Sequence, residues 1–403
     1  MSRVVYIPNM SDHAYTLSAA LRSCGIASEA LPEPDEESLE LGRKYSSGRE
    51  CFPFVVTTGD ILKKVREPGF KPGEAAFFMP MASGPCRFGQ YSRMHRIILD
   101  RLGYGDVPVV SPTSQNAYEE IGGAGMAFRI KGWQALVATD ILQKLLHQTR
   151  PYEVNPGETE QVYNQALSIL VKAVETGRNL VDVMREIRED FEGIKVDRRV
   201  IKPIIGVVGE IFMRSNRFSN NQVVKKLEEL GAEVWLAPIS EWIHYTCNRF
   251  KVESIAQRRY RDILKAFFLE KLQRYYEGRL EKTFHGFLPN CHEPPIEDIL
   301  ERSSPYIHFS FGGEAILSVG KAIDYVEKGA CGIVNVMPFT CMPGMVVTAV
   351  SKRLREDLNG LPWLNASYDG HEDTSTQIRL EAFIYQARQY RQASLSGSFH
   401  KRT

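Results

Sequence analysis

The sequence lacks several features that would assign it to particular classes of protein. No stretch approaches 18 uninterrupted apolar residues, so we expect no membrane-spanning helix. The opening MSRVVYIPNMSDHAY has no apolar core followed by a small-residue cleavage site, so no signal peptide is expected. Neither sign of charge dominates, since 50 Lys and Arg against 49 Asp and Glu leave +1. These absences predict a cytoplasmic protein and give no reason to expect nucleic acid or a membrane as partner.

Two compact motifs are also missing. The chain has no GxxxxGK loop ending in Ser or Thr, so ATP-driven chemistry would need another protein. Its seven cysteines include no CxxC pair, unlike those of ferredoxins and zinc fingers. In a cytoplasmic protein such cysteines are expected as free thiols, which leaves burial, metal binding or catalysis as their uses.

The pattern that is present is an alternation of short β-branched or aromatic runs with longer segments of helical period. It predicts an α/β fold with doubly wound, mostly parallel sheets, and 403 residues suggest two or three domains. Strands are expected at 4–9, 75–80, 107–112, 204–208, 232–238, 306–311, 332–337 and 361–366. The expected domains are an N-terminal α/β domain over 1–145, a helical connector over 146–200, a C-terminal α/β region over 201–390, and a disordered tail over 391–403.

Three cysteines share one setting. Cys51 lies in SGRECFPF, Cys86 in MPMASGPCRFGQY and Cys341 in VMPFTCMPG, and each directly precedes a segment of helical pattern. Pro53 and Pro343 follow two residues after their cysteines, where the first turn of a helix tolerates proline. A helix N-terminus stabilises an anionic thiolate or cluster, and the carboxyl ends of parallel strands form the ligand crevice of such sheets. Three converging thiolates would suit an iron–sulfur cluster with one non-cysteine position.

Spacing alone leaves this interpretation open, because single buried cysteines are common. Cys247, in a helical segment, and Cys331, at the start of a buried strand, are expected to be packed thiols. Cys291 and His292 form one weak candidate metal pair in a Pro-rich loop.

Longer phrases decide between these alternatives. SGRECFP, GPCRFGQY, VGEIFMRSNRFSN, GGEAILSVGKA, VMPFTCMPG and YDGHEDTSTQIRLEAF resemble the 2-hydroxyacyl-CoA dehydratase and benzoyl-CoA reductase superfamily. They are closest to its uncharacterised branch, a domain often found C-terminal to an activase-type ATPase module. The resemblance covers about 1–390, with the motifs in the expected order.

The resemblance implies two or three Rossmann-like domains with one [4Fe–4S] cluster on Cys51, Cys86 and Cys341. It also implies a separate ATPase activase as low-potential electron donor and an acyl-CoA or related small molecule as substrate for radical dehydration or reduction. Characterised dehydratases pair two related subunits, so a homo- or heterodimer is expected. The alternative hypothesis is a non-catalytic electron-transfer or cluster-carrying partner of the activase.

Polar side chains beside the cysteines and after the strand at 204–208 complete the candidate site. Such groups can hydrogen-bond cluster sulfides or orient a carbonyl, and arginine can hold a CoA phosphate or a carboxylate. The candidate catalytic residues are Glu50, Arg87 and Glu210. The candidate substrate-binding residues are Gln90, Tyr91, Arg214, Asn216, Arg217 and Glu314.

Each candidate also has a structural interpretation. Glu50 and Arg87 can pair with each other or with solvent. The arginine loop can be a helix-capping segment in which Ser219 and Gln222 form a capping box. Glu314 can simply follow a tight Gly-Gly turn.

The basic, aromatic stretch over 251–283 superficially resembles a nucleic-acid-binding helix. Its acids and an apolar stripe at Ile255, Ile263, Phe267 and Leu272 instead favour a solvated helix packed on the core. A docking face for the electron-donating ATPase is the alternative.

Overall fold

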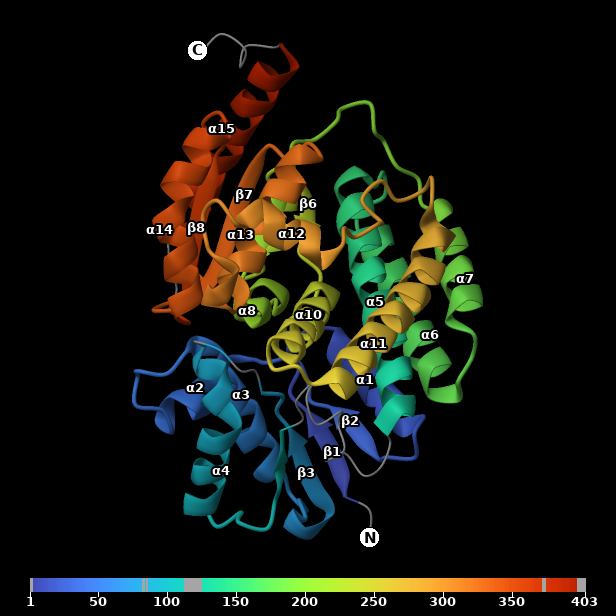
Figure 1. Cartoon of the computed structure of the whole chain (residues 1–403), viewed down its shortest axis with the longest axis vertical. Helices are drawn as coiled ribbons and strands as arrows, with labels where there is room; N and C mark the ends of the chain where they lie inside the picture. The colour runs from blue at the N-terminus through green and yellow to red at the C-terminus, as the bar shows by residue number, and fades with distance from the viewer. Residues whose placement is uncertain (1–2, 82–83, 85, 112–124, 372–374, 397–403) are drawn as a thin grey trace. The chain divides into compact units, whose positions relative to one another are not determined.

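The computed structural model describes residues 3–81, 84, 86–111, 125–371 and 375–396 (Figure 1). The chain divides into two compact units, each assembled from three stretches of sequence. Unit 1 comprises Met1–Gln143, Gln161–Gly193 and Pro238–Ile296, and unit 2 comprises Lys144–Glu160, Ile194–Ala237 and Glu297–Thr403. Each unit contains one parallel sheet, which confirms the predicted α/β class with Rossmann-like sheets. The expected connector over 146–200 is shared between the two units.

Unit 1 is built on a four-stranded sheet in the order β2-β1-β3-β4, with every pair parallel. The strands are short, and most of their residues are half or fully buried. In the central pair of strands, Val5 lies opposite Ala76. The strands are β1 (Val4–Ile7), β2 (Ser28–Ala30), β3 (Ala75–Phe78) and β4 (Val109–Val110).

Helices of two kinds complete unit 1. Those between and after the strands are α1 (His13–Arg22), α2 (Glu36–Lys44), α3 (Phe52–Val65) and α4 (Tyr91–Arg101), the last preceded by the 3-10 turn η2 (Arg87–Gln90). The remainder form a helical portion: α5 (Gly125–Thr149), α6 (Glu158–Thr176), α7 (Leu180–Glu192), α10 (Ser240–Ala256) and α11 (Tyr260–Glu281). The first residues of α6 and the last turns of α5 belong to unit 2.

Unit 2 repeats the strand arrangement of unit 1. Its order is β6-β5-β7-β8, again parallel throughout. The strands are β5 (Ile204–Gly209), β6 (Glu233–Leu236), β7 (Gly332–Pro338) and β8 (Trp363–Tyr368). The helices are α8 (Ile211–Ser215), α9 (Val223–Glu229), α12 (Ile296–Ser303), α13 (Glu314–Glu327), α14 (Met342–Asp357) and α15 (Thr376–Leu395), with a 3-10 turn η5 (Phe309–Phe311) before α13.

Glycine lets a pair of helices in each unit pack backbone to backbone. In unit 1 a Cβ on Gly59 of α3 would lie 1.6 Å from the carbonyl oxygen of Ser38 in α2. Gly42 of α2 makes the reciprocal close approach to Val55. In unit 2 a Cβ on Gly320 of α13 would lie 2.1 Å from the carbonyl oxygen of Ile299 in α12. These approaches hold α3 against α2 and α13 against α12, and the beginnings of α3 and α13 carry candidate site residues.

Seven of the predicted strands are confirmed, and one is wrong. The segment 306–311 forms a turn and η5, because His308 accepts the backbone N–H of Ser310 and Phe309 is exposed. Strand β2 was not predicted. The predicted disordered tail is helical as far as Leu395, and 397–403 lie outside the described residues. In the part of the chain that the structure describes, no helix has the length and apolar composition needed to cross a membrane.

Candidate functional site

Both sheets have a topological switch point, the place where open α/β sheets bind ligands. In unit 1 it lies between β1 and β3, because the chain continues from β1 to β2 on one side and then to β3 on the other. In unit 2 the equivalent place lies between β5 and β7. A ligand of either sheet would therefore lie beside the segments that leave these four strands.

In unit 1, Cys51 and Cys86 each stand at the start of a helical segment, as predicted. Cys51 is the N-cap of α3 with extended backbone, and Pro53 occupies the first turn. Cys86 follows β3 and is the N-cap of η2, which leads directly into α4. Cys51 is buried and Cys86 is partly buried, and neither is in a disulfide. Both thiols therefore belong to N-cap residues, where backbone N–H groups favour negative charge.

A hydrogen bond joins the two cysteine-bearing segments. Arg87, next to Cys86, donates from Nη1 to the carbonyl oxygen of Arg49 at 2.6 Å. The carboxylate of Glu50 is stabilised by backbone groups: it accepts the N–H of Ser47 at 2.9 Å and that of Arg49 at 3.1 Å. Burial raises the pKa of Glu50, but the Ser47 and backbone hydrogen bonds outweigh it and hold the pKa below its ordinary value. Glu50 and Arg87 therefore organise the loop around Cys51.

An aromatic layer containing a histidine packs beside these segments. The ring of Phe54, in the first turn of α3, stacks on His95 of α4 with centroids 4.9 Å apart. Tyr91 contacts both rings edge-on, and Cys51 belongs to the same buried cluster. Full burial lowers the pKa of His95 to about 3, so the imidazole is neutral at physiological pH. The surroundings of Cys51 are consequently apolar and uncharged on this side.

The two remaining candidates of unit 1 have different positions. Tyr91 lies in the aromatic layer, with its side chain buried. Gln90 is exposed and accepts a long hydrogen bond of 3.4 Å from Arg93. Of this pair, Gln90 is the side chain that a small molecule could reach.

In unit 2, Cys341 occupies the position that Cys86 has in unit 1. It follows β7, the third strand of its sheet along the chain, and is the buried N-cap of α14. Its backbone N–H bonds to Pro338 and its carbonyl accepts the N–H of Met345. Thr340 before it adopts a left-handed conformation with φ 61°, which turns the chain sharply between strand and helix. The predicted placement of Cys341 at a helix start is confirmed.

Glu210, Arg214 and Glu314 meet at the carboxyl end of β5. Glu210 is the N-cap of α8 and accepts the backbone N–H groups of Phe212 and Met213 at 3.2 and 2.9 Å. Glu314, the first residue of α13, accepts the N–H of Ile211 at 3.1 Å through Oε1. Three consecutive N–H groups are thus shared between two carboxyl groups.

One carboxyl of this pair holds a proton at neutral pH. Glu314 is 7 % exposed, and its Oε2 has no hydrogen-bond partner among the described residues. Burial and then the neighbouring charge of Glu210 raise the pKa of Glu314 to about 8. Arg214 is also buried and donates to the carbonyl oxygens of Gly209 and Ala237 at 2.7 and 3.1 Å. The group can therefore exchange a proton, and the charge of Arg214 opposes the rise in the pKa of both carboxyl groups.

The rest of the arginine loop caps a turn. Asn216 is buried and accepts the N–H of Ser219 at 2.9 Å, and Asn220 accepts that of Val223 at 3.2 Å. The expected capping box is wrong, because Gln222 is itself the N-cap of α9 in a left-handed conformation. Arg217 is the exposed member of this loop. It is the arginine of the loop that solvent reaches.

The other cysteines bond to backbone carbonyls or are packed. Cys291 Sγ contacts the carbonyl oxygen of Glu281, and Cys331 Sγ that of Gly329, each at 3.5 Å. Burial raises the pKa of both Cys247 and Cys331. His292 instead binds the Glu281 carboxylate at 2.8 Å. These contacts agree with packed thiols.

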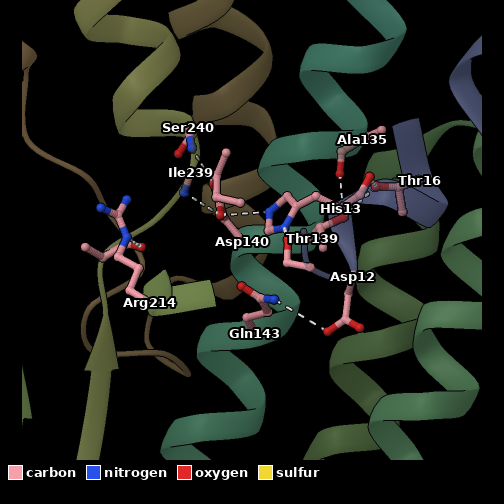
Figure 2. Close-up of polar contacts among 12 residues, drawn as sticks. Asp12, His13, Thr16, Ala135, Thr139, Asp140, Gln143, Arg214, Ile239 and Ser240 are labelled. Carbon is pink, nitrogen blue, oxygen red and sulfur yellow. Dashed lines mark hydrogen bonds and ion pairs between the residues drawn. The ribbon is translucent and has the colours of Figure 1, made fainter. Parts of the chain in front are cut away.

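A buried polar network at the end of β1 has no counterpart in the predictions from sequence. Figure 2 shows His13 of α1 pointing to Asp140 of α5, with Nε2 3.0 Å from Oδ1. The other ring nitrogen of His13 lies 2.8 Å from the hydroxyl of Ser11. Asp140 also accepts the backbone N–H groups of Ile239 and Ser240 at 3.0 and 2.9 Å, and so caps α10 from outside that helix (Figure 2).

The hydrogen bonds of this network favour the ionised form of Asp140. Burial raises the pKa of Asp140, but the His13 charge and the hydrogen bonds from His13 and Ser240 outweigh it and lower the pKa below its ordinary value. The ionised Asp140 accepts a hydrogen bond from Nε2 of His13. The side chains of Ser11, His13 and Asp140 are buried, so the arrangement joins α1, α5 and α10. The sequence feature that could have indicated this network is the polar run SDH at 11–13, shortly after β1.

Comparison with models of known protein families gives no match, and comparison with curated proteins gives none either. Across the described ranges, no group of three or more His, Cys, Asp and Glu side chains is placed to hold a metal ion.

Proposed function

We propose that the chain is a [4Fe–4S] protein of the 2-hydroxyacyl-CoA dehydratase type. It accepts a low-potential electron from an ATP-hydrolysing activase and uses it in radical dehydration or reduction of an acyl-CoA-like substrate. The observation that carries the proposal is the shared position of Cys51, Cys86 and Cys341. Each is the N-cap of a helical segment and is in no disulfide, and two of the three come after the third strand of their sheets along the chain.

The donor set fits such a cluster chemically. Thiolates are the ordinary ligands of iron–sulfur clusters, and three of them leave one iron with a position for another ligand. The helix N-termini favour the negative charge of thiolates and sulfides. When bound, the cluster would supply one-electron chemistry.

The chain's own side chains would act on the ligands. Arg87 holds the Cys51 and Cys86 segments together through the carbonyl of Arg49. The neutral His95 and its aromatic neighbours keep water and charge away from one side of Cys51. Such a low-polarity, desolvated environment is one of the means by which a protein sets the reduction potential of a cluster.

A specific observation favours the alternative, a cluster-carrying electron-transfer partner. Arg214 and Asn216, two of the side chains expected to bind substrate, make their hydrogen bonds to the protein backbone. Tyr91 is packed in the core. Gln90 and Arg217 are the exposed members of the predicted set. An electron-transfer partner would not need these side chains to bind a substrate.

The test is anaerobic purification followed by iron and sulfide analysis. Wild type is expected to hold about four irons and four sulfides per chain after reconstitution. Cys86→Ala, Cys51→Ala and Cys341→Ala should each lose most of both, whereas Cys24→Ala, a matched control outside the proposed set, should retain them. A wild type without iron, or full occupancy in Cys86→Ala, would refute the cluster.

The same protein distinguishes enzyme from carrier. An enzyme should change its electron paramagnetic resonance spectrum when acyl-CoA is added to the reduced cluster, because the non-cysteine position is accessible. A carrier should give the same spectrum with and without acyl-CoA.

A further inference from the structure

The helix α11 has an exposed apolar face that nothing in the proposed function uses. Tyr260, Leu264 and Phe268 are 72, 73 and 60 % exposed, and Phe267 and Tyr275 are exposed as well. These positions are separated by 4, 7, 8 and 15 residues from the first, so they lie on one side of the helix. At 1.5 Å per residue they span about 22 Å. We call these five residues the α11 stripe.

The prediction from sequence placed this helix differently. The segment 251–283 was expected to form one helix with Ile255 and Phe267 facing the core, but it is divided between α10 and α11, and these side chains are 50 and 46 % exposed. The buried face of α11 instead carries Ala266, Leu269 and Leu280 with several polar residues. Two leucines, one alanine and polar side chains make up this inward face, and the aromatic residues of the stripe lie outside it. An apolar surface of this size on a helix commonly marks an interaction site.

Helix α10 extends the same surface. It packs next to α11 (Figure 1), and the turn between them contains Arg258 in a left-handed conformation with φ 53°. Near this turn Val252 and Ile255 of α10 are also exposed. The apolar surface is therefore concentrated toward one end of a helical hairpin.

The hairpin of α10 and α11 carries an excess of positive charge. Several cations of the hairpin are neutralised within the chain: Arg259 by Asp262, Lys251 by Glu270, Arg274 by Glu277 and Arg249 by Glu253. Five others have no carboxylate in ion-pair distance in the described part of the chain. They are Arg258, Arg261, Lys265, Lys271 and Arg279. The whole chain carries only +1, so this excess is local.

The position of Lys271 helps to identify the occupant. It lies four residues after Phe267 and four before Tyr275, which puts a cation in the middle of the apolar stripe. A lipid bilayer would have to accommodate that charge among its acyl chains, whereas a carboxylate on a protein can pair with it. Two copies of this chain would bring like charges together, which is unfavourable.

We propose that the α11 stripe binds an acidic amphipathic helix of a partner protein. Apolar side chains of that helix would pack between Leu264, Phe267 and Phe268, and its Asp or Glu residues would pair with Lys271 and the flanking arginines. This is helix-on-helix recognition with apolar anchors and charge complementarity. The proposal does not depend on the cluster, so either can fail alone.

The test is selection from a displayed library of amphipathic helices against the full-length chain. Each library member has leucine at the apolar positions and Glu, Gln or Lys at the flanking positions, over about 15 residues to match the length of the stripe. We expect enrichment of Glu. The affinity of the selected helices should fall about tenfold or more for Phe268→Asp, since a central apolar anchor is lost.

Two further variants make the result specific. Lys271→Glu should reverse the preference, so that Lys-flanked helices are enriched; that outcome cannot come from misfolding. Ile378→Asp, at an exposed apolar residue of α15, should bind as wild type does. Equal enrichment of Glu, Gln and Lys, or unchanged binding by Phe268→Asp, would overturn the proposal.

The competing occupants have their own measurements. Sedimentation with vesicles of phosphatidylserine and phosphatidylcholine tests a membrane, and sedimentation velocity at increasing protein concentration tests a second copy. Binding to vesicles or self-association that Phe268→Asp abolishes would overturn the assignment to an acidic helix. Neither is expected for wild type.

Discussion

At the scale of single residues, burial determines the protonation of two side chains with opposite dependence on pH. His95 is kept neutral and Glu314 is kept protonated. Each costs stability in the pH range where the unfolded chain would hold the opposite charge state. The two ranges overlap between about pH 4.5 and 6.5, where the two effects have opposite signs, so each is measured through its own variant.

His95 should destabilise the folded chain as the pH falls. The pKa of its imidazole is about 3 in the folded chain and 6.5 in the unfolded chain. Between these values the unfolded chain binds a proton that the folded chain does not bind. The free energy of unfolding should fall by at most about 1.4 kcal/mol per pH unit from this group. His95→Phe, which keeps the stacking on Phe54, should flatten the slope in urea unfolding between pH 4.5 and 6.5. His371→Phe, at an exposed histidine, should leave it unchanged; equal slopes in all three proteins would contradict this.

Glu314 should act in the other direction. The pKa of its carboxyl is about 8 when folded and 4.5 otherwise, so between these values the folded chain holds a proton that the unfolded chain has released. Stability should therefore decline as the pH rises from about 4.5 to 8. Glu314→Gln retains an oxygen for the N–H of Ile211 and should remove much of this decline, as followed by thermal unfolding at pH 5, 7 and 8.5. The exposed Glu301→Gln is the control, and a decline that persists undiminished in Glu314→Gln would count against the shifted carboxyl.

At the scale of elements, the packing of α2 on α3 rests on glycine. Gly59→Ala would place a Cβ 1.6 Å from a helical carbonyl oxygen, and backbone cannot move aside as a side chain can. We expect a loss of about 1–3 kcal/mol or more in unfolding free energy. Gly278→Ala in α11 is the matched control, because its Cβ would meet no atom within 4 Å. It should be neutral or stabilising by up to about 1 kcal/mol. Similar losses for both variants would exclude close packing as the cause.

Elements with a strong local signal could be predicted from the sequence, and those set by distant contacts could not. Continuous apolar runs such as IIGVV located β5, because both faces of a parallel sheet are buried. Strand β2 was missed because its three residues, Ser28–Ala30, carry no apolar run, and it is positioned by pairing with β1. The aromatic alternation at 306–311 was misleading, since Tyr306 uses its hydroxyl to bond Asp357 and Phe309 faces solvent.

The candidate site divides in the same way. The helix-start positions of Cys51, Cys86 and Cys341 followed from local sequence, because proline and the preceding loop specify where a helix begins. The meeting of Glu210 with Glu314 required knowledge that two strand-to-helix connections of unit 2 lie side by side. The pairing of His13 with Asp140 joins residues 127 positions apart, and Asp140 sits in a helix with nothing local to mark it.

At the scale of the whole molecule, unit 2 depends on a stretch far from its sheet in sequence. In Lys144–Glu160, His147 and Arg150 bind the Glu228 carboxylate at 2.9 and 2.6 Å, and Tyr152 binds Glu233 at 2.9 Å. Glu228 and Glu233 are both buried. Removing a partner from a buried charge typically costs about 3–5 kcal/mol.

Unit 2 should therefore fold alone only when this stretch is present. A chain joining 144–160, 194–237 and 297–403 through long Gly/Ser linkers should unfold cooperatively in urea, followed by circular dichroism. The same chain without 144–160 should lack a cooperative transition, and adding the free 144–160 peptide should restore it in part. Cooperative unfolding of comparable stability without the stretch would show that these buried pairs are dispensable.

The interleaving of the two units also constrains the order in which the protein can be completed on the ribosome. The chain changes units five times, at the boundaries after residues 143, 160, 193, 237 and 296. The N-terminal sheet emerges first, but the N-terminus of α10, which Asp140 caps, is synthesised about a hundred residues later. Until then Asp140 lacks its two backbone N–H donors and has His13 as its partner. Nascent chains of intermediate length should accordingly expose this region to chaperones, and translation speed across 144–296 should affect the yield of folded protein.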